Sequence, residues 1–474
     1  MALLTLKQPQ LLAIPFALEH PRCALWGSCG IGKSSSALFV ADALMLTSGT
    51  RGPTLVCAPA RVARDVWIAE AAKWDQFSHL RVVHIGGTPT QRATILSRRP
   101  WADVYTISYE LLPWLVQYFM AKWPFRNVIA DEADNLKSFR LATKAGRDID
   151  PAAPQKHGHS GVRSYAIGRV AHTMVDRWIN LTGTPAGNGL KDLWGQTWYL
   201  DRGERLGRTH GSFMERWFRT NQYSGKVEAL PYAQAQIQDA LKDICLTLDA
   251  RDYFDLSEPV VTPIKVTLPA AARRIYTELE RDMFAQLEDG QELEVFNAAA
   301  LTNKCLQLAN GAVYTQHPSW EAVHDEKLEA LKSIVSEAGG AQILLAYEFI
   351  SDADRICKAF KSVARLAEPA GLAAFKAGAK QIGIAHPKSL SYGTDGLHTN
   401  CHTLVRFGHG WNLTQRLQML ERIGPMRQLQ INSGQVVQVY DIIAVDTLDE
   451  DAILRHESKR EVMDLLLDAM KRRK

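Results

Sequence analysis

The sequence lacks three features that would indicate a membrane protein, a protein stabilised by a zinc site or disulfide bonds, or a secreted protein. No apolar run approaches the roughly 20 residues that a helix needs to cross a bilayer. The seven cysteines form no C-x-x-C pair, and the N-terminus shows no basic segment followed by a long apolar core. The cysteine pattern argues against a zinc site and a disulfide framework, and their odd number fits a reducing compartment. We therefore expect a cytoplasmic protein that does not act at a membrane.

Net charge is also scarce. The chain has 55 Lys and Arg residues against 51 Asp and Glu residues, a formal charge of +4. The net charge alone does not indicate that the protein binds nucleic acid, so any positive surface that binds it must be local. The 474 residues suggest two to four domains and can bury more than one core.

Strand-like and helix-like segments alternate through the first 200 residues, and a second series of such segments begins at Gln342. This alternation is typical of parallel sheets with helices on both faces. We therefore expect an α/β protein of two lobes with a helical region between them. The first lobe is expected to span residues 1–268, including a helical segment at about 204–257, and the second residues 269–474.

The most informative stretch is the glycine-rich loop at residues 27–34, which reads GSCGIGKS and fits G-x4-G-K-S. Backbone N–H groups of such a loop wrap phosphate oxygens, and the following helix directs its positive end at them. Lys33 is expected to reach the β- and γ-phosphates, and the Ser34 hydroxyl to bind Mg²⁺. The glycines that leave room for a phosphate are Gly27, Gly30 and Gly32. The alternative is a flexible glycine turn capped by serines.

A second motif follows an apolar run at residues 127–130, which ends in Asp131 and Glu132. A carboxylate at the end of a buried strand suits Asp131 to bridging a metal ion. Glu132 could orient and deprotonate an attacking water molecule. A solvated acidic turn is the alternative. With the glycine-rich loop, this motif indicates nucleotide hydrolysis with Mg²⁺ as the cofactor.

At this point the sequence resembles the superfamily 2 helicases, and within them the Swi/Snf-like DNA translocases in their compact bacterial or phage-type form. Residues 131–137 (DEADNLK) are similar to the D-E-A-H-x-L-K-N signature, with Asp134 in place of His and Ser138 in place of Asn. Residues 181–185 (LTGTP) are similar to the third motif of this group, where a generic DEAD-box protein has S-A-T. The resemblance runs over nearly the whole chain and implies two tandem RecA-like lobes.

The resemblance also implies roles for single residues of the first lobe. Gln10 corresponds to the glutamine that recognises adenine. Three residues of the third motif would couple the ATP site to the nucleic acid along which the protein moves: Thr182, Gly183 and Thr184.

In the second lobe, Gln418, Arg422 and Arg427 resemble the sixth motif, whose arginines approach the γ-phosphate. Two extra residues separate the two arginines here, so either could be the arginine finger. We choose Arg427, with Arg422 as its partner and Gln418 in contact with ATP. Alone, the two arginines could equally belong to a solvated helix face.

Loops after the strands of both lobes would, by the same resemblance, grip one strand of a nucleic acid. The candidate contacts are Arg61, Ser108, Tyr109, Lys137, Ser391 and Gly393. Hydroxyls, backbone N–H groups and a few basic side chains suit contact with phosphates without reading of bases. Four aromatic residues have spacings that fit core packing rather than base stacking: Trp178, Trp194, Trp198 and Tyr199.

The resemblance implies a monomeric, ATP-dependent translocase on double-stranded DNA, in a bacterial cytoplasm or a phage-infected cell, with or without a recruiting protein. An arginine finger delivered by lobe closure would contribute on the order of 10³ to 10⁵ in rate. One alternative is a helicase that unwinds DNA or RNA. Another is a nucleic-acid-binding scaffold that uses ATP as a clamp and scarcely hydrolyses it.

Overall fold

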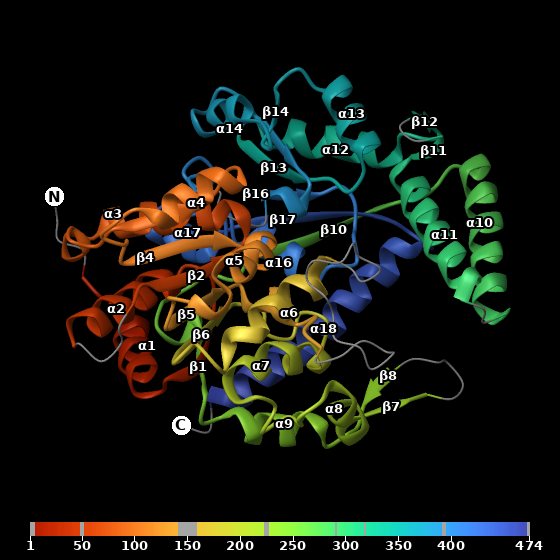
Figure 1. The fold of residues 1–474 in the computed structure, drawn as a ribbon. Coiled ribbons are helices and arrows are strands. Elements are labelled where there is room, and N and C mark those ends of the chain that lie inside the picture. The colour runs from red at the N-terminus through yellow and green to blue at the C-terminus, as the bar shows by residue number, and fades with distance from the viewer. Residues whose placement is uncertain are drawn as a thin grey trace. The chain divides into compact units, whose positions relative to one another are not determined.

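The computed structural model describes residues 5–47, 52–140, 159–221, 227–289, 292–316, 319–390 and 395–471. The chain divides into two compact units: Met1–Asp255 with Lys459–Lys474, and Leu256–Ser458. Within these described ranges, the structure contains no helix whose length and apolar character would let it cross a membrane. Figure 1 shows the course of the chain by colour.

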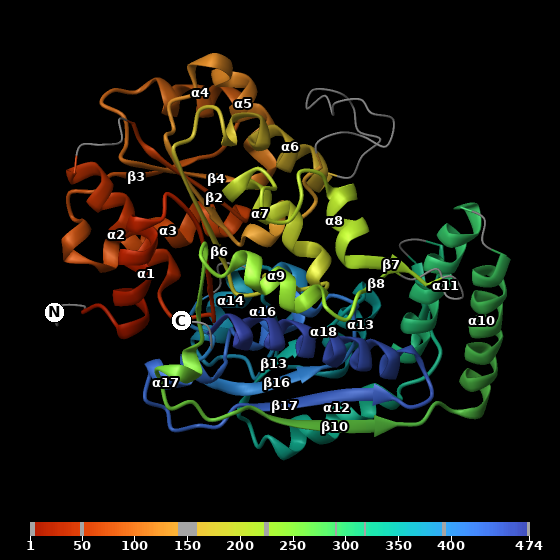
Figure 2. The ribbon, with the colours of Figure 1, turned by 90° about the horizontal axis from the view of Figure 1, so that it is seen from below.

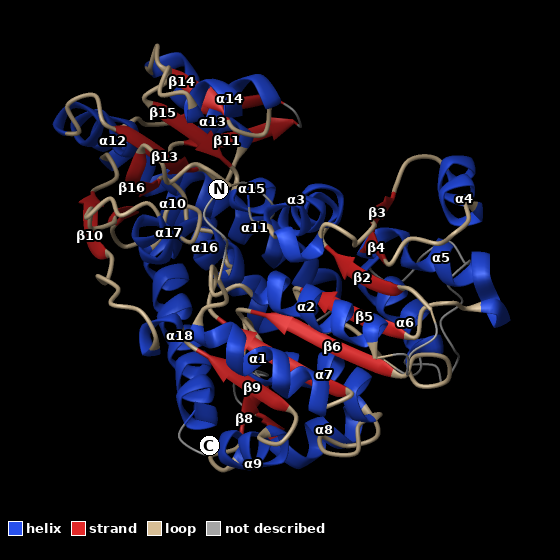
Figure 3. Cartoon of the chain, turned by 90° about the vertical axis from the view of Figure 1, so that its left-hand side faces the viewer, coloured by secondary structure: helices blue, strands red, loops and turns tan. Residues whose placement is uncertain are grey.

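A seven-stranded sheet with the order β3-β4-β2-β5-β6-β1-β9 forms the centre of the first unit, and every strand pair in it is parallel. Its strands are β1 (Arg22–Gly27), β2 (Thr54–Ala58), β3 (Val82–Ile85), β4 (Val104–Ser108), β5 (Asn127–Asp131), β6 (Arg177–Thr182) and β9 (Cys245–Leu248). Figure 3 shows the arrows of β2, β5, β6 and β9 running in the same direction. Every residue of β2, β4 and β5 is buried, which explains their continuous rather than alternating apolar runs.

Helices and one small hairpin complete the first unit. The helices are α1 (Gln8–Glu19), α2 (Lys33–Leu46), α3 (Trp67–Lys73), α4 (Pro89–Ser97), α5 (Leu112–Phe119), α6 (His159–Ala171), α7 (Leu193–Asp201), α8 (His210–Trp217) and α9 (Ala233–Leu241). The hairpin joins β7 (Phe218–Thr220) to β8 (Val227–Ala229). Trp178, Trp194, Trp198 and Tyr199 are buried in the core of this unit, so their predicted packing role is confirmed.

The second unit has its own parallel sheet of six strands, in the order β10-β17-β16-β13-β15-β14. The strands are β10 (Val260–Val266), β13 (Gln342–Ala346), β14 (Val363–Arg365), β15 (Ile382–Ala385), β16 (Cys401–Arg406) and β17 (Gln438–Ala444). Figure 2 shows β13, β16, β17 and β10 in sequence across this sheet. Along β13, Ile343 and Leu345 pack in one apolar cluster and Leu344 and Ala346 in another. Alternate side chains point to opposite faces, so this sheet is covered on both.

The helices of the second unit are α10 (Ala270–Asp289), α11 (Glu292–Asn310), α12 (Glu326–Glu337), α13 (Ile350–Ala359), α14 (Pro369–Lys376), α15 (Pro387–Leu390), α16 (Leu413–Leu420), α17 (Pro425–Gln430) and α18 (Leu448–Lys471). Figures 1 and 2 show α10 and α11 side by side. A short antiparallel pair, β11 (Ala312–Gln316) and β12 (Ser319–Ala322), follows α11. The parallel α/β sheets of the two units confirm the expected fold class.

The division between the units differs from the boundary expected at residue 268. Strand β10 pairs in parallel with β17, so its backbone hydrogen bonds belong to the second sheet. The segment 204–257, expected to be helical, also supplies β9, which pairs with β1 at the edge of the first sheet. The C-terminal part of α18, from Lys459 onward, belongs to the first unit. There, Lys459 Nζ donates a hydrogen bond to Asn188 Oδ1 at 3.3 Å.

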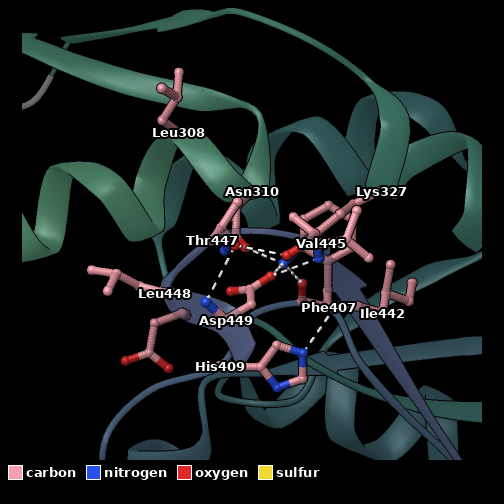
Figure 4. Close-up of polar contacts among 12 residues, drawn as sticks. Leu308, Asn310, Lys327, Phe407, His409, Ile442, Val445, Thr447, Leu448 and Asp449 are labelled. Carbon is pink, nitrogen blue, oxygen red and sulfur yellow. Dashed lines mark hydrogen bonds and ion pairs between the residues drawn. The ribbon is translucent and has the colours of Figure 1, made fainter. Parts of the chain in front are cut away.

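A buried cation organises the polar interior of the second unit (Figure 4). The Lys327 side chain on α12 is completely buried, and its Nζ lies 2.5 Å from Asp449 Oδ2. The same ammonium donates to Asn310 Oδ1 at 2.8 Å and to the carbonyl of Phe407 at 3.1 Å. Asn310 Nδ2 donates in turn to Asp352 Oδ2 at 2.9 Å. One lysine therefore links the end of α11, the start of α18 and the segment after β16.

We expect Lys327→Met to lower the free energy of unfolding by about 3–5 kcal/mol, because it leaves the Asp449 carboxylate buried without its cation. Lys332→Met is the matched control on the same helix, since Lys332 pairs with Glu329 at 2.7 Å on the surface. Such an exposed pair contributes about 0–1 kcal/mol. Denaturation of the full chain followed by circular dichroism measures both variants. Equal stability of the two would contradict this role of Lys327.

Candidate active site

The glycine-rich loop, Asp131 and the third motif meet at one edge of the first sheet. Strands β1, β6 and β5 are neighbours, with Trp26 opposite Thr182 and Leu181 opposite Asp131. All three strands therefore end at the same level. In doubly wound α/β sheets, ligands bind at the carboxyl ends of the strands.

The glycine-rich loop has the geometry that a phosphate requires. Gly30 and Gly32 have φ angles of 81° and 88°, a left-handed conformation that favours glycine. Lys33 begins α2, a helix of 14 residues, so its free N–H groups lie at the loop. The Lys33 ammonium donates to the carbonyls of Gly27 and Ser28, which keeps the positive charge over the loop. These residues fit a nucleotide phosphate.

Gly183 of the third motif lies against this loop. A Cβ atom at Gly183 would be 3.2 Å from the Gly27 carbonyl oxygen and 3.8 Å from Lys33 Nζ. Thr182 is completely buried, and its Oγ1 accepts the Thr184 N–H at 3.1 Å. The turn of the third motif is therefore closed on itself and contacts the loop that holds Lys33.

Asp131 lies at the end of β5, and its side chain is almost entirely buried. Its Oδ2 accepts the indole N–H of Trp67 at 2.8 Å. Burial raises the pKa of Asp131, and the Trp67 hydrogen bond and the charge of Lys33 lower it in part. Among the described residues, no three His, Cys, Asp or Glu side chains are grouped to hold a metal ion. A single carboxylate beside a phosphate-binding loop suits Mg²⁺, which is often held by one or two carboxylates, water and substrate phosphates.

Glu132 follows Asp131 in a left-handed backbone conformation, with φ 54° and ψ 59°. A non-glycine residue in this region costs on the order of 1 kcal/mol or more, and such residues cluster at functional sites. The chain reverses here into a short 3₁₀ turn, Ala133–Leu136. Asp131 and Glu132 are thus placed at the end of the strand by a sharp turn.

Asp134, which stands where the family has His, belongs to a charged cluster that joins the second motif to the segment after the third motif. Burial raises the pKa of Asp134 to about 6. Lys137 Nζ lies 3.8 Å from Asp134 Oδ2 and 3.5 Å from Asp192 Oδ2. Asp192 Oδ2 also accepts the backbone and side-chain N–H groups of Asn188 at 2.9 and 3.0 Å. The ammonium of Lys137 is engaged by two carboxylates, which argues against its expected contact with nucleic acid.

Two other expected nucleic-acid contacts have buried side chains, and their contact with nucleic acid stays a prediction. Ser108 is 6% exposed and Tyr109 is fully buried, so neither side chain is available to a nucleic acid. Tyr109 instead donates its hydroxyl to the carbonyl oxygen of Asp131 at 2.9 Å. Arg61 is partly exposed just after β2 and remains a candidate. Ser391 and Gly393 lie outside the described residues.

Gln10 packs under the glycine-rich loop. Its Nε2 donates to Ser35 Oγ at 2.7 Å, and its Oε1 accepts the Lys7 N–H at 2.7 Å. A Cβ atom at Gly32 would lie 2.5 Å from Gln10 Nε2. The amide of Gln10 therefore packs against and hydrogen-bonds to the start of α2. Recognition of adenine by Gln10 stays a prediction.

The candidate arginines of the second unit lie on different elements. Gln418 is buried on α16, which ends at Leu420, and α17 begins at Pro425. Arg422 falls in the turn between these helices, and Arg427 lies on α17. The two extra residues between the arginines thus form a turn. Arg427 pairs with Asp395 Oδ1 at 3.1 Å, and its side chain is 24% exposed.

Sequence reasoning did not identify Trp67 or Tyr109 as a partner of Asp131, and it did not single out Asp192. Trp67 and its partner Asp131 are 64 positions apart. No local pattern shows where an indole N–H or a phenol hydroxyl will point.

Comparisons with known proteins give relatives by sequence and by structure. No protein-family model matches the chain. The p41 protein of Acyrthosiphon pisum secondary endosymbiont phage 1 is 42% identical over 470 residues, which is 98% of each chain. The Arabidopsis thaliana ATP-dependent helicase BRM is 25% identical over 40% of this chain and 8% of that protein. The Drosophila melanogaster helicase domino is 24% identical over 59% of this chain and 8% of that protein.

Among solved structures, the Sulfolobus solfataricus SWI2/SNF2 ATPase core in complex with dsDNA covers 98% of this chain and 93% of its own, with 17% identity and a TM-score of 0.43. The ATPase core domain of that protein alone has 17% identity and a TM-score of 0.41. The sequence relatives and the motifs described above make the classification: the chain belongs to the family of the phage protein p41 and is a Swi/Snf-like member of superfamily 2.

Proposed function

We propose that this protein is an ATP-dependent translocase on double-stranded DNA. The observation that carries the proposal is the meeting of the glycine-rich loop, Asp131 and Gly183 at one sheet edge, with Lys33 Nζ 3.8 Å from the Cβ position of Gly183. Similarity of the chain to two helicases, BRM and domino, supports a motor rather than a small-molecule kinase.

In the proposed reaction, the loop N–H groups and Lys33 bind the β- and γ-phosphates of ATP. Ser34 and Asp131 would hold Mg²⁺, which would supply positive charge to offset the charge of the phosphates. Glu132 would orient the attacking water and accept its proton. Each of these side chains belongs to the first unit.

The second unit supplies the last positive group in this proposal. Arg427, with Arg422 as its partner, would neutralise charge on the γ-phosphoryl group in the transition state. Because this group comes from the other unit, hydrolysis would require closure of the two units, and cycles of closure would move the protein along DNA. Gln418 would contact ATP from the same side.

Contact with DNA is proposed through Arg61 and the loops after the strands, and it addresses the phosphate backbone rather than the bases. With a formal charge of only +4, we expect modest, salt-sensitive binding. We also propose that the motor is monomeric and works in the cytoplasm of a bacterium or an infected cell.

The test is steady-state ATP hydrolysis without nucleic acid and with single-stranded DNA, duplex DNA or RNA. We expect duplex DNA to stimulate best, and Lys33→Ala to remove activity under every condition. Best stimulation by RNA would contradict the assignment to DNA. Absence of stimulation by any nucleic acid would favour the ATP-clamped scaffold. A forked DNA substrate in the same series separates translocation from strand unwinding.

A further inference from the structure

Two aromatic side chains donate hydrogen bonds to Asp131, one to its side-chain carboxylate and one to its backbone carbonyl. The indole N–H of Trp67 donates to the carboxylate at 2.8 Å, and the hydroxyl of Tyr109 donates to the backbone carbonyl at 2.9 Å. Trp67 and Tyr109 are both completely buried. Water therefore cannot compete for these hydrogen bonds, which are stronger in such surroundings than at a surface.

The two donors lie on the segments that follow β2 and β4, the two strands on one side of β5. The sheet order is β4-β2-β5, with Cys57 opposite Ala130 and Ala58 opposite Ser108. After β2, a π-helical turn (Val62–Val66) leads into α3, which begins with Trp67. After β4, Tyr109 begins a 3₁₀ turn. Both segments thus reach the end of β5.

An indole is a suitable donor to a carboxylate that must bind a cation. It occupies one lone-pair direction of Oδ2 but carries no charge, so it leaves the negative charge of Asp131 available. A lysine or arginine in its place would neutralise that charge. Groups that hydrogen-bond to a metal ligand fix its orientation, and their loss typically costs 10- to 100-fold in metal affinity.

We propose that Trp67 is a positioning residue that sets the affinity of the ATP site for Mg²⁺ by fixing the carboxylate of Asp131. This inference rests on the proposed function, in which Asp131 is a Mg²⁺ ligand. Trp67 touches neither nucleotide nor metal in this proposal, and it acts only through Asp131.

The experiment compares Trp67→Phe with the wild type in equilibrium binding of a fluorescent ATP analogue. Binding is measured first in EDTA and then in a Mg²⁺ titration. We expect Trp67→Phe to bind the analogue in EDTA within about twofold of the wild type, because Lys33 and the loop are unchanged. We expect the Mg²⁺ concentration for half-maximal enhancement to rise about tenfold or more.

Trp178→Phe is the matched control. Trp178 is also completely buried in the first unit, but its indole N–H donates to Asn180 Oδ1 at 2.8 Å. Its Mg²⁺ titration should match that of the wild type. A Trp67→Phe titration that also matches the wild type would overturn the role of Trp67. Absence of any Mg²⁺ effect in the wild type would instead overturn the proposed ATP site, and the inference with it.

Circular dichroism checks that each variant is folded. If Trp67→Phe is not, the comparison is made between Trp67→His, whose ring can still donate an N–H, and Trp67→Leu, whose side chain has no donor. The histidine variant should then need less Mg²⁺ than the leucine variant. The reverse order, or no difference, would overturn the proposal.

Discussion

Glu132→Gln should stop turnover and leave ATP bound. The amide has the size of the carboxylate but cannot accept a proton from water, and loss of a general base typically costs about 10²- to 10⁴-fold in kcat. Glutamine can occupy the left-handed conformation at φ 54° with the same strain as glutamate, so the turn after β5 should persist. Single-turnover hydrolysis and equilibrium binding of an ATP analogue measure the two effects separately.

Two variants control this result. Lys33→Ala should lose binding as well as turnover, because it removes the charge that the loop holds over the phosphates. Glu110→Gln should resemble the wild type, since Glu110 is an exposed acid that pairs with Arg163 at 2.8 Å. A kcat for Glu132→Gln within threefold of the wild type would show that another group activates the water.

Arg427→Ala should lower kcat by about 10³-fold or more while ATP binding changes little, which is the effect expected of an arginine finger. The Arg427 side chain is partly exposed and pairs with the exposed carboxylate of Asp395, and an ion pair that reaches solvent in this way is weak enough to exchange for a phosphate. Steady-state hydrolysis with saturating duplex DNA measures the loss.

Arg422→Ala is measured beside it, because the turn between α16 and α17 separates the two arginines. A larger loss for Arg422→Ala would make Arg422 the finger and Arg427 its partner. Arg365→Ala is the control, since Arg365 makes a comparable surface pair with Asp354 at 2.8 Å in the same unit. Unchanged turnover in both Arg422→Ala and Arg427→Ala would refute a motor that depends on either arginine.

The parts of the site that could be predicted are those whose residues lie close together in the sequence. The glycine-rich loop combines strand, turn and helix start within residues 23–46, and Asp131 ends an uninterrupted apolar run. Parallel strands end at a common edge, so these two motifs could be expected to meet once the fold class was known.

Side-chain direction could not be predicted in the same way. Motif position placed Tyr109 after a strand, but its side chain turns into the core and binds the carbonyl of Asp131 instead of pointing outward. The basic side chain of Lys137 likewise meets Asp192, which is brought near only when β5 and β6 pair.

Local sequence patterns could not predict the boundary between the units either. Strand β10 has the alternating sequence of a strand, but its partner β17 begins at Gln438, far along the chain. A parallel partner leaves no turn signal beside the strand, since the two are not joined by a hairpin. The sequence around Val260 therefore shows a strand without showing which sheet it joins.

The first unit is discontinuous along the chain, and this affects how it can form during synthesis. Its core includes Val462 as a partly buried member, although the rest of the unit ends at Asp255. On a ribosome, some 200 residues of the second unit must be translated before this valine emerges. The nucleotide-binding lobe can begin to fold early, but it acquires its final packing only after its companion lobe has been made.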